Sequence, residues 1–238
     1  MRRRHLPLLA LLAVAIAAFA AGCGSKKEAA TTVAAVNGTT TAVDTTDLLE
    51  GQTPPSIYND ASLFALHADD VPTGYVVDRD NTRAVTNADS AKGRGDEYLR
   101  QLESWGRITG YATGWLPSGD SAQNDPVQIQ SSGSTFETEG GAIDAFAQGV
   151  KEADKLQVEK TDMPDTVGDE SRMWIAKLGE STAGQKPLTI YEIAWRSGRV
   201  LATLAVATRG GASKDDALAL ANTQQERIDR IVSGKEKP

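Results

Sequence analysis

The segment from Leu188 to Thr208 constrains the fold of this chain more than any other. Apolar side chains recur at every second position over Leu188–Trp195 and again over Val200–Thr208, with Arg196-Ser197-Gly198-Arg199 between the two runs. This alternation, with glycine at the reversal, predicts a β-hairpin. Because hairpins join antiparallel neighbours, a purely parallel sheet is excluded.

The rest of the chain after Ser56 reads as a mixture of strands and helices. We expect further strands at Gly74–Val77, after Gly106 as far as Trp115, at Val127–Thr135 and at Met173–Leu178. Helical spacing of apolar residues predicts a short helix at Ala61–Leu66, one at Gly95–Trp105 and one at Gly141–Ala153.

The two longest predicted helices carry recognisable apolar faces. In Gly141–Ala153, the positions i, i+3, i+4 and i+7 are Ile143, Phe146, Ala147 and Val150. A last helix is expected to begin near Ser213, which can form a capping box with Asp216. Its apolar stripe, interrupted by Gln224, consists of Ala217, Leu220, Ala221, Ile228, Ile231 and Val232.

These elements predict an α+β fold for residues 56–238, as a single globular domain. The economical packing is a central antiparallel β-sheet flanked by helices, an α/β/α sandwich. Cys23 is the only cysteine of the chain, so no intramolecular disulfide can form. The stability of the domain must therefore come from a packed core.

The N-terminus has the three-part pattern of an export signal. Arg2 to Arg4 precede an almost purely aliphatic run from Leu6 to Ala21, and small residues follow it. A membrane-spanning helix needs about 17 residues, and this run is just shorter than that. We therefore expect residues 1–22 to be a signal peptide, although a retained span is the alternative.

Residues Ala20-Ala21-Gly22-Cys23 resemble the acceptor site of a bacterial lipoprotein, with Ala20 where leucine is more usual. The resemblance implies cleavage between Gly22 and Cys23 and attachment of diacylglycerol to the Cys23 thiol, with acyl chains such as palmitate. It predicts a lipid-anchored protein on the extracytoplasmic face of the cell membrane, with membrane lipid as a partner. An ordinary signal peptide cleaved near Gly22 is the alternative.

Residues 23–55 are expected to be the lipidated cysteine and a disordered tether rich in threonine and alanine. Large apolar residues are few there, and Pro54-Pro55 closes the segment. Such a composition buries too little apolar surface to offset the entropy of ordering it.

Charge excludes one class of partner. The chain has a formal net charge of −7, and removal of residues 1–22 would make it more acidic by taking away Arg2 to Arg4. Binding to nucleic acid depends on clustered lysines and arginines that neutralise phosphates. We therefore expect no nucleic-acid partner.

No residue pattern in the chain indicates a catalytic, cofactor or metal site. His67 is the only histidine after the signal, H-E-x-x-H is missing, and Gly119–Gln123 fails as a G-x-S-x-G elbow at its fifth position. His67 is interpreted as a residue at the C-terminal end of a helix. We therefore predict no enzyme, no catalytic residue, no cofactor and no metal ligand.

The acidic clusters have simpler explanations than catalysis. Asp78-Arg79-Asp80-Asn81 begins like a calcium loop but lacks the later glycine and glutamate, and is interpreted as a solvated turn. Asp69-Asp70 and Asp215-Asp216 suit a turn or the first residues of a helix. Paired carboxylates of an envelope hydrolase remain the alternative.

The four tryptophans are also candidates for ligand binding. They are Trp105, Trp115, Trp174 and Trp195, and packing in the core is their ordinary role. Trp115 lies at a strand end, where aromatic side chains often anchor a ligand or a partner. We therefore name Trp115 as a possible ligand-facing aromatic residue.

Several short motifs of the domain resemble bacterial cell-envelope lipoproteins and sensor-type extracellular domains. They are Asp69–Tyr75, Ala142–Phe146, Val167–Ser171 and Trp195–Val206. The resemblance implies a fold like that of the Mog and PsbP proteins and, for most members, no assigned reaction. The kinase-linked sensor domains carry disulfides, which this chain lacks.

The sequence thus favours a membrane-anchored cell-envelope lipoprotein with a non-catalytic extracytoplasmic domain that binds a small molecule or an envelope protein. An envelope hydrolase and a structural or assembly lipoprotein are the alternatives.

Overall fold

The computed structural model describes residues 56–118, 126–156, 158–163, 165–179 and 187–235. The expected signal peptide, Cys23 and the expected tether lie outside the described residues, as does Gly119–Gln123.

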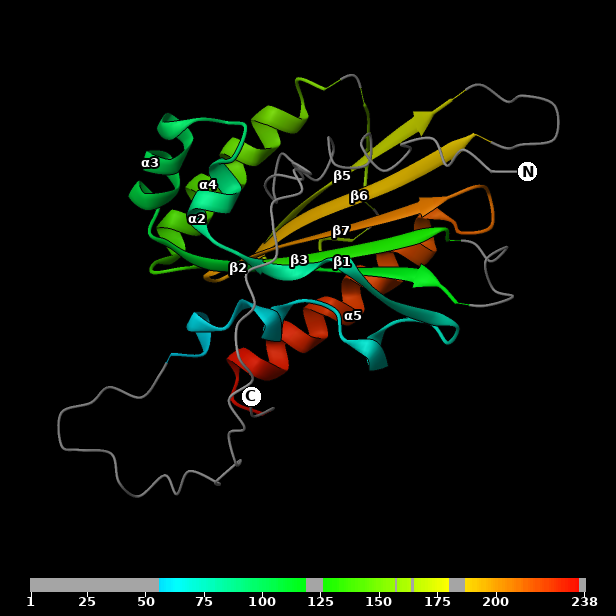
Figure 1. The fold of residues 1–238 in the computed structure, drawn as a ribbon, viewed down its shortest axis with the longest axis horizontal. Coiled ribbons are helices and arrows are strands. Elements are labelled where there is room, and N and C mark those ends of the chain that lie inside the picture. The colour runs from blue at the N-terminus through cyan, green and yellow to red at the C-terminus, as the bar shows by residue number, and fades with distance from the viewer. Residues whose placement is uncertain (1–55, 119–125, 157, 164, 180–186, 236–238) are drawn as a thin grey trace, which may run out of the picture.

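Seven strands form one antiparallel sheet with the order β1-β2-β3-β7-β6-β5-β4 (Figure 1). This confirms the α+β fold with a central antiparallel sheet flanked by helices. The strands are β1 Tyr75–Val85, β2 Arg107–Pro117, β3 Gln128–Phe136, β4 Glu159–Thr161, β5 Glu170–Leu178, β6 Leu188–Ser197 and β7 Val200–Thr208.

The predicted hairpin is confirmed and lies inside the sheet. Ser197 at the end of β6 pairs with Val200 at the start of β7, so the turn consists of Gly198 and Arg199. Gly198 has a φ of 55°, a left-handed conformation that favours glycine. The hairpin places β7 next to β3 and thereby joins the two halves of the sheet.

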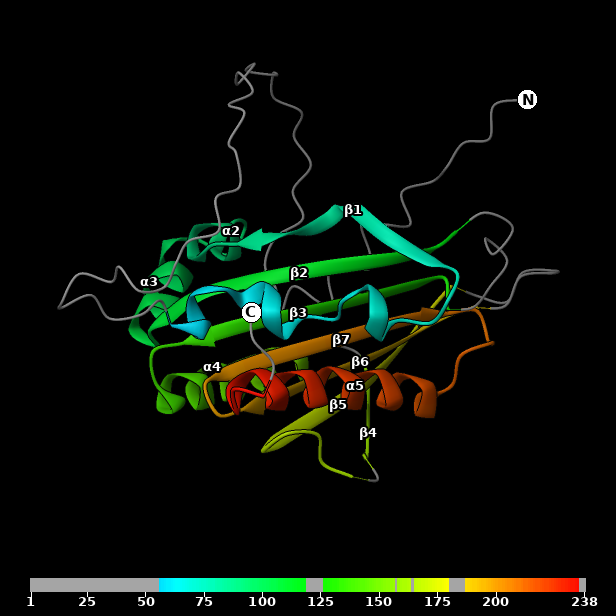
Figure 2. The ribbon, with the colours of Figure 1, turned by 90° about the horizontal axis from the view of Figure 1, so that it is seen from below.

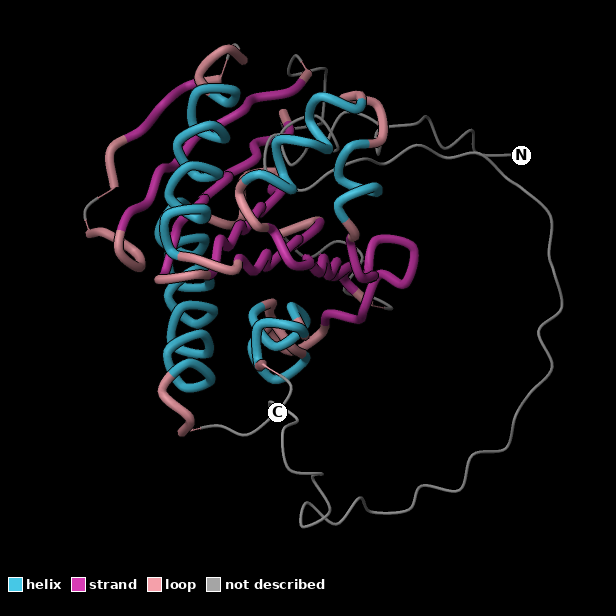
Figure 3. Tube along the Cα trace, turned by 90° about the vertical axis from the view of Figure 1, so that its left-hand side faces the viewer, coloured by secondary structure: helices cyan, strands magenta, loops and turns pink. Residues whose placement is uncertain are grey.

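Helices cover both faces of the sheet. They are the 3₁₀ helices η1 Ile57–Asn59, η2 Ala61–Phe64 and η3 Ala68–Asp70, and the α-helices α2 Asn87–Ala91, α3 Asp96–Ser104, α4 Glu139–Ala153 and α5 Lys214–Val232. The long helix α5 packs beside the 3₁₀ helices on one face, as Figure 2 shows. Helix α4 covers one end of the opposite face, with α2 and α3 nearby (Figures 1 and 3).

The sequence prediction missed several short elements. The expected helix at Ala61–Leu66 is the 3₁₀ helix η2, and α2 and β4 were not predicted. Each missed element is five residues or shorter, too short for a hydrophobic period to be visible.

Helix α5 begins where the sequence predicts. Ser213 is its N-cap and forms the predicted capping box with Asp216. Gln224, however, does not interrupt the buried face. Its side chain is fully buried, donates to the backbone carbonyls of Phe64 and Ser132, and accepts from the Ser131 hydroxyl. A polar residue can therefore belong to the core because all its hydrogen bonds are made there.

The predicted apolar face of α4 is partly wrong. Ile143 is 42% exposed, and Ala147 is also exposed. The buried positions are instead Gly141, Ala142, Ala145, Phe146, Gly149 and Ala153. Small residues on this face let the helix approach the sheet closely, and that packing outweighs the burial of the larger Ile143.

Two hydrophobic clusters build most of the core. The larger one lies between the sheet, α5 and the 3₁₀ helices, and includes Phe64, Trp115, Ile193, Trp195 and Ile228. The other lies under α4 and includes Phe136, Phe146, Trp174 and Leu201. Within the described ranges, no helix is both long and apolar enough to span a membrane.

Candidate functional site

A cleft of about 480 Å³ opens between the N-terminal half of α5 and the segment that leads into β1. Its size falls in the range of small-molecule sites. The lining residues are Pro72, Thr73, Tyr75, Pro126, Val206, Gly211, Ala212, Asp216, Ala219, Leu220 and Thr223.

The α5 wall follows from helix geometry. Asp216, Ala219, Leu220 and Thr223 are spaced at i, i+3, i+4 and i+7, so they share one face of the helix. Leu220 also packs against the main core cluster, whereas Ala219 is exposed. The small side chain of Ala219 therefore leaves space that a larger residue would fill.

The opposite wall is a turn built from Pro72, Thr73 and Gly74. Pro72 disfavours a helical conformation of Val71, so the 3₁₀ helix η3 ends at Asp70. Gly74 has a φ of 96°, which reverses the chain into β1. The sequence had predicted this turn and the helix start, but not that they face each other.

The polar side chains of the cleft lining are Thr73, Tyr75, Asp216 and Thr223. The Tyr75 hydroxyl donates to the Pro126 carbonyl oxygen at 2.5 Å, and the Thr223 hydroxyl donates to the Ala219 carbonyl oxygen at 3.0 Å. The backbone N–H and the hydroxyl of Ser213 lower the pKa of Asp216 by donating to its carboxylate. The lining of the cleft therefore combines apolar side chains with hydroxyl groups and one carboxylate.

Trp115 lies in the core and not at the surface. It is 3% exposed and belongs to the cluster under α5, while its Nε1 has no hydrogen-bond partner among the described residues. Trp174 and Trp195 are also buried, whereas Trp105 is partly buried against the cluster under α4. Trp174 Nε1 donates to Asp154, and Trp195 Nε1 donates to Gln225.

The position predicted for His67 is wrong. His67 precedes η3 as its N-cap residue instead of ending a helix. Its Nε2 lies 3.0 Å from the Ser62 carbonyl oxygen. Asp70 completes this turn by accepting from the His67 backbone N–H and also forms a buried ion pair with Arg227, at 2.7 Å.

The predicted solvated turn at Asp78–Asn81 is also wrong in part, because these residues belong to β1. The pairing with β2 shifts between Asp78 and Arg83, so the segment is an irregularity within the strand. Asp78 is 9% exposed and accepts from Asn81 Nδ2 at 2.6 Å. The carboxylate thus supports the bulge, and no described group of histidines, cysteines or acids has the geometry to hold a metal ion.

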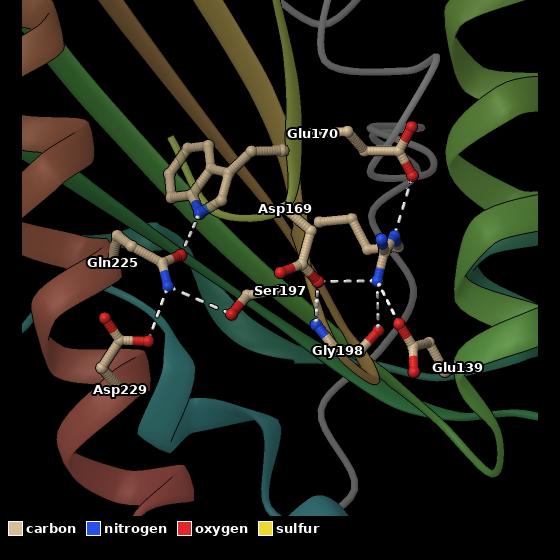
Figure 4. Close-up of polar contacts among 9 residues, drawn as sticks. Glu139, Asp169, Glu170, Ser197, Gly198, Gln225 and Asp229 are labelled. Atoms are coloured by element: carbon tan, nitrogen blue, oxygen red, sulfur yellow. Dashed lines mark hydrogen bonds and ion pairs between the residues drawn. The ribbon is translucent and has the colours of Figure 1, made fainter. Parts of the chain in front are cut away.

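Three carboxylates meet at Arg196, next to the β6–β7 turn (Figure 4). The guanidinium of Arg196 contacts Glu139 at 3.0 Å, Asp169 at 2.8 Å and Glu170 at 2.8 Å. Asp169 also accepts from the backbone N–H of Gly198 at 2.7 Å. These acids share one arginine, so their arrangement ties segments together and does not form an acid pair across a cleft.

One carboxylate has no such partner. Glu192 lies in the middle of β6, is 6% exposed, and its Oε1 has no hydrogen-bond partner among the described residues. Burial raises the pKa of Glu192 from 4.5 to about 8. Burying an unpaired polar group costs on the order of 1–3 kcal/mol, so this acid needs an explanation. The sequence could have indicated this buried acid, because Glu192 interrupts an otherwise apolar strand.

Comparisons with known proteins give a distant structural similarity. No protein-family model matches the chain, and no curated protein matches it in sequence. Among solved structures, it is similar to the extracellular domain of PknH from Mycobacterium tuberculosis. The two share 11% sequence identity with a TM-score of 0.43, over 74% of this chain and 98% of that one.

Proposed function

We propose that this protein is a lipid-anchored lipoprotein of the cell envelope whose domain binds a small molecule in the cleft beside α5. The cleft carries the ligand-binding part of the proposal, because its volume of about 480 Å³ is typical of small-molecule sites and its lining combines apolar side chains with a few polar groups. The export signal and Cys23 support the anchor.

The chemistry of the lining indicates the kind of ligand. Leu220 and the two prolines offer apolar surface, and Asp216 and Thr73 belong to the polar part of the lining. A ligand with an apolar body and a hydrogen-bonding end fits this arrangement. We propose binding without turnover, since no observation on the described residues favours the hydrolase alternative.

Filling the cleft tests the binding. The substitution Ala219→Trp places a large ring in the cleft at an exposed position, so the core stays intact. Asn222→Trp is the matched control, because Asn222 is exposed on the same helix but does not line the cleft. The full-length protein, extracted in mild detergent from cells that make it, is analysed by native mass spectrometry.

We expect a bound small molecule on the wild type and on Asn222→Trp, and its loss on Ala219→Trp. Absence of any bound molecule, or its retention by Ala219→Trp, would contradict the proposal. A hydrolytic activity that follows the protein through purification would contradict the non-catalytic part.

The anchor is tested by Cys23→Ser. Since Cys23 is the only thiol, the variant cannot be acylated and should accumulate as a slower-migrating precursor or leave the membrane after cleavage elsewhere. If it matured normally and stayed with membranes after high-salt and carbonate washing, retention through the apolar run would be the better explanation.

A further inference from the structure

The lining of the cleft beside α5 carries one charged side chain, that of Asp216. Two cations are near it in the sequence, Arg209 and Lys214, but neither lines the cleft. Lys214 Nζ instead donates to the Asp162 carbonyl oxygen at 2.7 Å. Within the described part of the chain, the wall of the cleft therefore carries a negative charge and no positive one.

One oxygen of the Asp216 carboxylate is available to a ligand. The backbone N–H and the hydroxyl of Ser213 both donate to Oδ2. No described residue donates to Oδ1, and the side chain of Asp216 is exposed. Because the bonds from Ser213 favour the ionised form, the carboxylate is charged at neutral pH.

The hydroxyl groups of the lining have few protons to offer a ligand. The Tyr75 hydroxyl donates its proton to the Pro126 carbonyl oxygen. The Thr223 hydroxyl donates its proton to the Ala219 carbonyl oxygen. Since a hydroxyl has a single proton, neither group can donate a second hydrogen bond, whereas the Thr73 hydroxyl can donate or accept.

Several backbone groups of the lining cannot donate either. Pro72 and Pro126 have no N–H. The Ala212 N–H donates to the Thr208 hydroxyl oxygen at 3.0 Å. The lining residues Ala219, Leu220 and Thr223 lie inside α5, where backbone N–H groups bond within the helix. The cleft is therefore better suited to a ligand that donates hydrogen bonds than to one that accepts them.

The positive end of the α5 dipole does not reverse this preference. By itself, the N-terminus of a helix attracts an anion. Asp215 and Asp216 occupy the first turn of α5, however, and their charges oppose that attraction. A ligand that covers Asp216 also removes water from the carboxylate, and a cationic group compensates for this loss where a neutral or anionic one does not.

We propose that the ligand of the cleft is a protonated amine with an apolar body. Its ammonium group donates to Asp216 Oδ1, and its body lies on Leu220 and the two prolines. This inference rests on the proposed function, because it names the ligand class of the same cleft.

Pentylamine, pentanol and pentanoate are the probes, because they share one aliphatic chain and are cationic, neutral and anionic at pH 7. Their binding to the full-length protein in mild detergent is measured by equilibrium dialysis. Ala219→Trp in the same detergent gives the binding that does not involve the cleft. After this correction, we expect pentylamine to bind at least about tenfold more tightly than pentanol or pentanoate, since its hydrogen bond is made to a charged group.

Two substitutions in the first turn of α5 separate contact from long-range charge. Asp216→Asn removes the charge but keeps an oxygen that can accept from Ser213, so the start of the helix is retained. It should bind pentylamine about tenfold more weakly and pentanol as the wild type does. Asp215→Asn is the matched control, because it removes the same charge from the same turn but does not line the cleft. It should bind pentylamine as the wild type does.

Equal or tighter binding of pentanol or pentanoate in the cleft would overturn the inference and leave the proposed function standing. A molecule retained by the wild type, lost on Ala219→Trp and lacking a basic nitrogen would do the same. An equal loss of pentylamine binding in Asp215→Asn and Asp216→Asn would also count against the inference, because it would show no direct contact. If no probe bound in the cleft and no molecule were retained, the proposed function would fail as well. The comparison of the three probes on the wild type decides the inference even if Asp216→Asn did not fold.

Discussion

Buried polar residues in this domain differ in how their hydrogen bonds are satisfied. Gln224 and Ser131 lie in the core under α5, where they hydrogen-bond to each other and Gln224 donates to backbone carbonyl oxygens. Arg107 is buried, and its hydrogen-bond partners among the described residues are neutral: the Ser134 hydroxyl, the Val85 carbonyl oxygen and Asn87. Burial lowers its pKa to about 10. Glu192 differs from both because its Oε1 accepts no hydrogen bond from a described residue.

Glu192 should make the protein less stable as the pH rises. The folded-state pKa of about 8 exceeds the ordinary value of 4.5, so between these values the folded protein holds a proton that the unfolded chain has lost. The free energy of unfolding therefore falls by about 1.4 kcal/mol per pH unit across that window. The loss is complete above pH 8, where both states are ionised.

The substitution Glu192→Gln removes this dependence. Urea unfolding at pH 5, 6, 7 and 8 should show that the variant gains on the wild type as the pH rises, with Glu226→Gln as the control. A constant difference between Glu192→Gln and the wild type over this range would show that the acid is not held protonated by the fold.

At the scale of elements, the docking of α4 depends on glycine at one position. A Cβ built on Gly141 would lie 1.9 Å from the Trp105 carbonyl oxygen, at the end of α3. At the neighbouring Gly140 the nearest atom is the Thr138 hydroxyl, at 3.9 Å. Gly141 is therefore required for the close contact with Trp105, whereas Gly140 has room for a larger side chain.

The pair gives a matched prediction. Gly141→Ala should destabilise the protein by about 1–3 kcal/mol, because α4 must move away from Trp105. Gly140→Ala should be neutral or stabilise it by up to about 1 kcal/mol, because alanine favours the helix and meets nothing. Thermal unfolding measures the change in stability of each variant. Equal changes would show that α4 is not held by the contact with Trp105.

The sequence predicted the positions of helices and strands better than it predicted which of their side chains are buried. The hairpin and the start of α5 have local signals, a glycine reversal and a capping box, and both are confirmed. The buried face of α4 has none, because contact with Trp105 selects Gly141 over the larger Ile143. The cleft could not be predicted either, since it needs Pro72 and Ala219 to face each other across 147 residues of chain.

At the scale of the whole molecule, the sheet separates two different surfaces. The α5 face carries the larger core and the cleft, and the buried Trp115 Nε1 on this face has no hydrogen-bond partner in the described part of the chain. The α4 face carries the buried side chains of Glu192 and Gln128 beside the cluster that includes Ala205 and Ala207. The cleft and the buried carboxylate therefore lie on opposite faces of the sheet.

Arg196 holds together segments that are far apart in the chain. Through Glu139 it contacts the first turn of α4, through Glu170 the start of β5, and through Asp169 the loop before it, while its own strand ends at the Gly198 turn. The side chain of Arg196 is 9% exposed, but those of its three partners are 36–60% exposed, so solvent screens part of each interaction.

Replacing Arg196 should therefore weaken the whole domain moderately. Arg196→Met keeps most of the aliphatic stem and leaves three carboxylates that can turn to water, so we expect a loss of about 1–3 kcal/mol in the free energy of unfolding. Arg172→Met is the control, because Arg172 is exposed on β5 and donates to a backbone carbonyl oxygen. Urea unfolding followed by tryptophan fluorescence and by circular dichroism measures both variants. Equal stability of Arg196→Met and the wild type, or an equal loss in the control, would show that the cluster in Figure 4 does not tie these segments together.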